Sequence, residues 1–172
     1  MIRSREARQR ASQVLQMVGI TTPPVDVERI ATFLGFTVIP FDFPDAVSGL
    51  TFIEEGVKSI GVNAGQARVR QRFSIAHELG HYLSGHEAYD ESRIRVEGQP
   101  DYVNAHGRQE IEANEFASEL LMPRQMLERD ILRAGELDVP VLAKRYQVSE
   151  QAMWIQLMDH KLASKYAKSS GS

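Results

Sequence analysis

Residues 72–83 read RFSIAHELGHYL, and this stretch decides how the rest of the chain is interpreted. It contains the pattern His-Glu-x-x-His at positions 77–81. On a helix, residues four apart share one face, with Cβ atoms about 5–6 Å apart, so His77 and His81 can reach the same metal ion. Glu78 lies about a quarter-turn away and can reach a water molecule beside that ion. The pattern therefore predicts two metal ligands and a general base for hydrolysis.

The residues around the pattern predict that it lies on a buried helix. Apolar or small residues recur at three- and four-residue steps in two sets: Phe73, Ala76, Gly80 and Leu83, and Ile75, Leu79 and Tyr82. They occupy much of the helix circumference, which is typical of a helix inside a core. Two imidazoles and a carboxylate cost free energy when buried without partners, and a bound metal would provide partners.

A zinc site needs a third protein ligand, and a second helix downstream offers one. Residues 110–121 read EIEANEFASELL, and Pro123 ends the pattern because proline cannot donate the next helical hydrogen bond. One face of this helix is small and mostly apolar, and it carries Glu110, Ala113, Asn114, Ala117, Leu120 and Leu121. We expect the face that carries Glu112, Glu115 and Glu119 to be solvated.

Glu110 is the predicted third ligand because it is the one acid on the small, apolar face. Glu112 is the alternative ligand. Asn114, one turn after Glu110, is placed to bond the free N–H of a ligand imidazole and so fix its tautomer. Glu110 could equally be an ordinary acid at a helix N-terminus, stabilised by the helix dipole, and the spacing alone leaves that interpretation open.

The remaining histidines are weaker candidates for the metal site. The metzincin pattern would place a third histidine at position 87, where this chain has glutamate. We therefore expect His86 in a loop or beside a ligand. His160 lies in a helical pattern far along the chain and is expected to face solvent.

The segment between the two helices, residues 85–108, is expected to be a long loop. It is polar, contains Gly98-Gln99-Pro100 and shows little sustained period. Loops of this length often form lids or binding elements. Tyr102 and His106, together with Tyr89, are candidates for stabilising the oxyanion that forms during amide hydrolysis.

The chain before the His-Glu-x-x-His stretch predicts two helices and then three strands, the last two forming a hairpin. The ranges are 5–18 and 25–34 for the helices and 36–39, 50–53 and 59–62 for the strands. The predicted fold class is α+β, with a small, mostly antiparallel sheet packed on helices. We expect the strand nearest the site to be able to pair with an extended substrate, and residues 60–63 are the candidate edge.

Residues 141–162 predict two helices joined by a tight turn, in the form of a helix-turn-helix, with Ser149 as N-cap of the second. Glu150, Asp159 and a single positive charge, Lys161, make the second helix a poor match to DNA phosphates. Its apolar residues are expected to be shared between the core and a surface for a protein partner: Met153, Trp154, Leu157 and Met158.

Together, the two helical motifs resemble those of the ImmA/IrrE metallopeptidases. The resemblance is carried by residues 72–81 and by Glu110-x-Glu-Ala-Asn-x-Phe-Ala-x-x-Leu-Leu-Met-Pro123, with upstream matches at Pro24-Val25-Asp26, Leu34-Gly35 and 48–63. It covers roughly residues 24–160. It implies a gluzincin-like zinc peptidase with a zincin-like domain, in which His77, His81 and a downstream Glu bind the metal and Glu78 is the catalytic base.

Members of this family are typically paired with an Xre-type helix-turn-helix repressor, which they inactivate by limited cleavage in mobile elements or stress responses. The resemblance thus implies a zinc-dependent endopeptidase that cuts a cognate regulatory protein, an Xre-type repressor, and derepresses genes. The expected metal is Zn²⁺, with another divalent ion such as Mn²⁺ as the alternative. The alternative function is a noncatalytic metal-containing regulator that binds a protein or DNA through its C-terminal helices.

The organisation expected from these patterns is a zincin-like metallopeptidase domain over residues 1–125, a helical extension over 126–166 and a disordered tail over 167–172.

The chain has 172 residues, 42% of them hydrophobic, no cysteine and a net charge of −3. We expect a cytoplasmic protein, because the sequence shows neither an apolar leader nor a stretch of about 18 apolar residues that could span a membrane. The acidic balance argues against general binding to nucleic acid.

Overall fold

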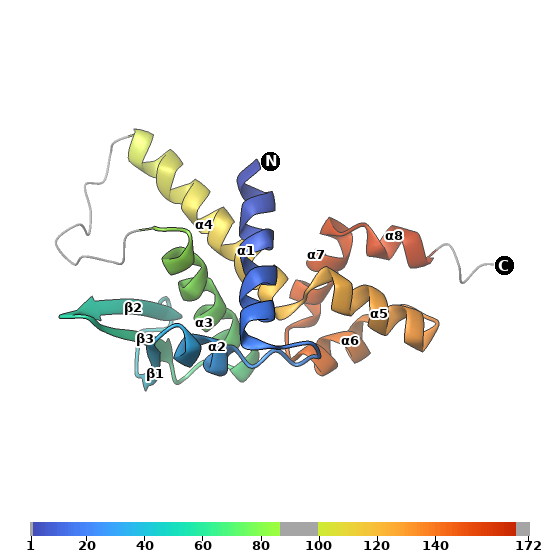
Figure 1. The fold of residues 1–172 in the computed structure, drawn as a ribbon, viewed down its shortest axis with the longest axis horizontal. Helices are drawn as coiled ribbons and strands as arrows, with labels where there is room; N and C mark the ends of the chain where they lie inside the picture. The colour runs from blue at the N-terminus through green and yellow to red at the C-terminus, as the bar shows by residue number, and fades with distance from the viewer. Residues whose placement is uncertain (1, 87–99, 168–172) are drawn as a thin grey trace.

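The computed structural model describes residues 2–86 and 100–167, and side chains over 5–86 and 107–166. This part of the chain contains eight helices and one three-stranded sheet, so the α+β class is confirmed (Figure 1). The elements are α1 (Ile2–Val18), α2 (Val27–Phe33), β1 (Phe36–Phe41), β2 (Gly49–Glu54), β3 (Val57–Asn63), α3 (Arg68–Leu83), α4 (Pro100–Leu121), α5 (Arg124–Ala134), α6 (Val139–Tyr146), α7 (Glu150–Asp159) and α8 (Leu162–Ala167).

The first two helices form where the sequence predicts them. α1 buries its apolar stripe and ends at Gly19, which has φ +73°. α2 begins two residues later than expected because the Asp26 side chain accepts a hydrogen bond from the Arg29 backbone N–H at 3.0 Å and so caps the helix. Gly35, with φ +84°, follows the end of α2.

The sheet is mixed, and the expectation of a mostly antiparallel sheet is wrong. Its strand order is β1-β3-β2, with β3 parallel to β1 and antiparallel to β2. The hairpin around Glu55-Gly56 joins β2 to β3 as predicted. Residues 60–63 therefore lie in the central strand, where neighbours occupy both sides of the backbone, and they cannot be the open edge. The alternation of apolar residues identifies strands but does not say which of them pair. The sequence therefore did not reveal that β2 is an edge strand in contact with α3.

The second part of the loop expected over residues 85–108 is helical, because α4 begins at Pro100, and residues 87–99 lie outside the described part of the chain. Proline suits the first helical position, since its fixed φ matches a helix and its missing N–H would have no helical partner there. The residues that follow, 101–109, are mostly polar and show no sustained apolar period. The sequence pattern therefore revealed only the second half of α4.

α4 packs against both α3 and α1, and its C-terminal part lies near the middle of the molecule (Figure 1). The two helices come close together at Gly80, where an added Cβ would lie 3.1 Å from the Ala113 Cα and 3.1 Å from the Ala113 carbonyl oxygen. Two small residues thus let the helix backbones come together. This contact sets where every side chain of α4 lies relative to α3.

The acidic face of α4 is not solvated as expected, because Glu112 and Glu119 are buried and Glu115 is half-buried. Glu112 and Glu119 are 8% and 6% exposed, because α1 and α7 pack over this face. His160 is also buried, at 5% exposure, and its Nε2 lies 2.9 Å from the Glu119 carboxylate. The expectation that His160 faces solvent is therefore wrong. For each of these polar groups, a partner on another helix offsets the free-energy cost of burial.

The C-terminal helices are attached to α3 through Arg72. Its buried guanidinium donates hydrogen bonds to the backbone oxygens of Val25 (2.8 Å) and Gln147 (3.2 Å). Gln147 belongs to the tight turn between α6 and α7, and the Ser149 side chain caps α7 as predicted. Whether this helix pair acts as a helix-turn-helix stays a prediction, as does the division of the chain near residue 125. The expected tail over 167–172 lies outside the described side chains.

α5 and α6 are joined by a buried carboxylate. Asp130 accepts hydrogen bonds from the Arg145 Nε at 2.8 Å and the Tyr146 hydroxyl at 2.9 Å. Burial alone would raise the pKa of Asp130, but the hydrogen bonds from Arg145 and Tyr146 outweigh burial and lower it. The carboxylate therefore stays ionised and holds the two helices together.

α7 presents both a buried and an exposed apolar face. Met153 and Leu157 are buried, whereas Trp154, Ile155 and Met158 are about half exposed. This division agrees with the expectation that the helix packs into the core with one side only.

Across residues 2–86 and 100–167, none of the helices combines the length and apolar character needed to cross a bilayer.

The close approach at Gly80 gives a stability prediction. Gly80→Val places branched carbons against the α4 backbone, and we expect the free energy of unfolding in urea to fall by about 1–3 kcal/mol. Gly107→Val is the matched control, because a Cβ at this exposed position of α4 meets no atom within 4 Å. The control should match or slightly exceed the parent protein. Equal stability of the two variants would contradict the packing described at Gly80.

Candidate metal centre

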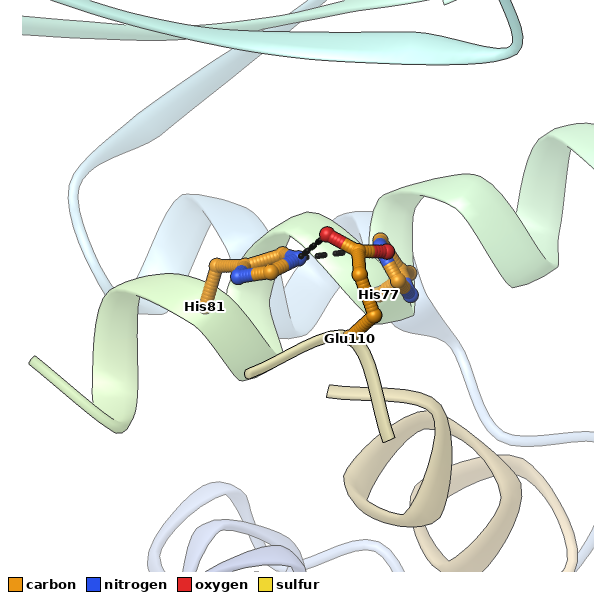
Figure 2. Close-up of side chains that lie close together, drawn as sticks. All are labelled: His77, His81 and Glu110. Carbon is orange, nitrogen blue, oxygen red and sulfur yellow. Dashed lines mark hydrogen bonds and ion pairs between the residues drawn. The ribbon is translucent and has the colours of Figure 1, made fainter. Parts of the chain in front are cut away.

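The site is formed by two helices that cross at a short distance. His77 and His81 lie one turn apart on α3, and Glu110 comes from α4 and faces the space between them (Figure 2). The two Nε2 atoms lie 3.0 Å apart. The Glu110 carboxylate lies 3.2 Å from the His77 Nε2 and 3.1 Å from the His81 Nε2.

The three side chains fit a divalent metal ion. Their ligand atoms all lie within 4.8 Å of one another. Tetrahedral ligands at about 2.0–2.2 Å from zinc are separated by about 3.3–3.6 Å, so small side-chain rotations would bring these atoms to coordination distance. Two imidazoles and one carboxylate also leave a coordination position for water or substrate, as in catalytic zinc sites.

Asn114 lies where the sequence predicts, one turn after Glu110. Its Oδ1 is 2.9 Å from the His77 Nδ1. An amide oxygen only accepts hydrogen bonds, so the His77 Nδ1–H donates to it. The His77 Nε2 then carries a lone pair that faces Glu110 and His81, which is the tautomer that a metal ligand needs.

The charges at the site favour a cation. When the imidazoles are protonated, hydrogen bonds from His77 and His81 hold the pKa of Glu110 well below its usual range. Burial lowers the pKa of His77, but the hydrogen bond and charge of Glu110 outweigh burial and raise it. Glu110 is therefore an ionised carboxylate at neutral pH, and both imidazoles are oriented towards it.

Glu78 lies beside this group and is held by the sheet. Its Oε2 accepts a hydrogen bond from the Thr51 hydroxyl at 2.7 Å. Thr51 belongs to edge strand β2 and is only 6% exposed. Thr51 has no signal in the sequence, because threonine is ordinary in strands and its contact depends on how β2 lies against α3.

Glu112, the alternative ligand, makes different contacts. One of its oxygens accepts a hydrogen bond from the Arg10 Nη1 at 2.7 Å, and the other lies 3.4 Å from the His86 Nε2. His86 in turn lies 3.0 Å from His81, Nδ1 to Nδ1. Burial, followed by the charge of His81, lowers the pKa of His86. Arg10 was missed at the sequence level because it merely flanks the buried stripe of α1.

The candidate oxyanion residues cannot be placed. Tyr102 and His106 fall within the range of α4, but their side chains lie outside the described part of the chain. Tyr89 also lies outside the described residues. Their role stays a prediction.

Two imidazoles and a carboxylate on crossing helices, with a glutamate held beside them, define a metallopeptidase-like α+β protein of the His-Glu-x-x-His type. The model of the Peptidase M78 family, described as an IrrE N-terminal-like domain, matches residues 32–158. The match covers well over half of the sequence, and the chain belongs to this family. The resemblance to ImmA/IrrE proteins is thereby confirmed.

A solved structure described as a Mycobacterium tuberculosis transcriptional regulator has a similar fold, with a TM-score of 0.62 at 20% sequence identity. The match covers 92% of this chain and 46% of that chain, so this protein spans about half the length of the regulator. At this identity the likeness establishes the fold alone. No curated protein matches the chain in sequence.

The geometry separates the two candidate third ligands. Glu110→Gln should weaken zinc binding at least about 100-fold, because a neutral amide replaces the ionised ligand. Metal content after dialysis and chelator competition would measure this. Glu136→Gln, at an exposed position, is the control and should bind as the parent does. Full occupancy in Glu110→Gln would remove Glu110 from the ligand set.

Proposed function

We propose that this protein is a zinc-dependent endopeptidase that makes a limited cut in a cognate regulatory protein, in which His77, His81 and Glu110 hold the metal. The observation that carries the proposal is the position of Glu78. It lies next to the ligand His77 on α3 and is fixed by Thr51, which is what a general base beside a metal requires. A structural metal site would not need this carboxylate.

The chemistry follows from the residues present. His77, His81 and Glu110 would hold a divalent ion, which when bound would supply Lewis-acid activation of water and of a peptide carbonyl. Glu78 accepts the proton of the attacking water and can return it to the leaving amine. Thr51 donates to one oxygen of Glu78 and so keeps the carboxylate oriented towards the site. Asn114 keeps the His77 Nδ1 protonated and its Nε2 free to bind the metal.

The substrate is proposed to bind as an extended segment along β2. β2 is an edge strand of the sheet and carries Thr51, which donates a hydrogen bond to the proposed base, Glu78. The backbone of β2 therefore lies close to Glu78. An added strand gains backbone hydrogen bonds whatever its sequence, and side-chain contacts then provide specificity. The role first expected for residues 60–63 thus passes to β2.

We propose an Xre-type repressor as the substrate, in the cytoplasm. Membership of the M78 family supports this choice, because the ImmA/IrrE resemblance implies such partners. The fold shared with a transcriptional regulator is consistent with a role in gene control. Zinc is preferred over manganese because a set of two imidazoles and one carboxylate matches the ligands of catalytic zinc sites.

A noncatalytic regulator is the second candidate function. It is favoured by the exposed Trp154, Ile155 and Met158 on α7, which could receive a partner protein. Under this alternative the metal would stabilise the fold and no peptide bond would be cut. The two functions differ in whether Glu78 matters.

Glu78→Gln tests the proposed function. We expect this variant to retain zinc and stability while cleavage of a cognate Xre-type repressor falls at least about 1,000-fold, because the amide cannot accept a proton. Mass analysis of the fragments would measure cleavage. Glu136→Gln is the matched control and should cut normally.

Undiminished cleavage by Glu78→Gln would contradict the mechanism. If the zinc-loaded parent binds the repressor without cutting it, the noncatalytic alternative is favoured.

Thr51 gives a second, finer test. Thr51→Val keeps the shape of the side chain but removes the hydroxyl, and we expect kcat to fall about 10-fold with little change in KM or zinc content. Thr51→Ser restores the donor and should recover most of the lost rate. Equal rates for the Val and Ser variants would show that the hydrogen bond to Glu78 does not position the base.

A further inference from the structure

The second nitrogen of His81 begins a chain of contacts that leads away from the metal centre. The His81 Nδ1 lies 3.0 Å from the His86 Nδ1, and the His86 Nε2 lies 3.4 Å from one oxygen of Glu112. The other oxygen of Glu112 accepts a hydrogen bond from the Arg10 Nη1 at 2.7 Å. The same Arg10 nitrogen donates to the Ser84 hydroxyl at 3.2 Å. The chain thus connects α3, the residues after it, α4 and α1.

These groups are shielded from water. The side chains of His86 and Glu112 are 9% and 8% exposed, whereas Arg10 is one-third exposed. Buried polar groups are retained where their partners satisfy them. Arg10 supplies the positive charge that lets Glu112 remain an ionised carboxylate inside the protein.

The hydrogen bonds in this chain have one consistent direction. Glu112 accepts only, so the His86 Nε2–H donates to it. A neutral His86 then presents a bare Nδ1, and the His81 Nδ1–H must be the donor between the two rings. The His81 Nε2 is left with its lone pair facing His77 and Glu110.

We propose that His86, supported by Glu112 and Arg10, is a positioning residue that fixes the tautomer and ring orientation of the metal ligand His81. This rests on the proposed metal centre. The two ligand histidines then have separate supports: Asn114 for His77 and His86 for His81. Glu112 acts on the metal through His86 without binding it.

Metal affinity, measured without any substrate, tests the proposal. His86→Leu should weaken Zn²⁺ binding about 10–100-fold in chelator competition and alter the visible spectrum of the Co²⁺-loaded protein. His86→Gln keeps an acceptor for His81 and should recover much of the affinity. Glu112→Gln should give an intermediate loss.

His160→Leu is the matched control, because it removes the other buried histidine that contacts a glutamate of α4, here Glu119. It should lower thermal stability but leave zinc affinity and the Co²⁺ spectrum unchanged. A His86→Leu variant with the affinity and spectrum of the parent would overturn the proposal. If that variant does not fold, parent-like affinity of Glu112→Gln would overturn it instead. A parent protein that binds no zinc would refute the metal centre itself.

Discussion

The close approach of α3 and α4 at Gly80 and Ala113 is the constraint on which the rest of the structure depends. It brings a carboxylate of α4 to two imidazoles of α3, and neither helix could form the centre alone. Glu110 lies one turn before Ala113, so its position follows from the same contact. Packing and chemistry therefore share one determinant, since a separation of the helix axes would also separate the ligands.

The C-terminal half of α4 is covered on more than one side. α3 covers one side of α4 and α1 covers another. The buried carboxylates of α4 therefore need partners on neighbouring elements. Glu112 finds Arg10 and His86, and Glu119 finds His160. Buried ion pairs of this kind add little net stability but strongly disfavour other arrangements of the helices, because a displaced charge would be left unpaired.

Much of the site could be predicted from the sequence because it depends on spacing within single helices. The four-residue step between His77 and His81, and that between Glu110 and Asn114, are properties of one helix each. Apart from the missed first half of α4, the errors concern contacts between elements. The sequence predicts a solvated Glu119 because the helix that covers it, α7, lies far along the chain and leaves no mark on the pattern of α4. The edge role is predicted for β3 because the alternation of apolar residues does not reveal the order of strands in a sheet.

If His86 and Glu112 support His81 as proposed, the contact between Arg10 and Glu112 would couple the N-terminal helix to metal binding. If docked α1 stabilises the arrangement that binds the ion, then the ion favours docked α1 by the same factor, because coupling between two equilibria is reciprocal. A protein that displaced α1 would thus act as an allosteric effector, releasing metal from a centre that it never touches. α1, which contributes to the core, would then also be the element through which metal binding is regulated.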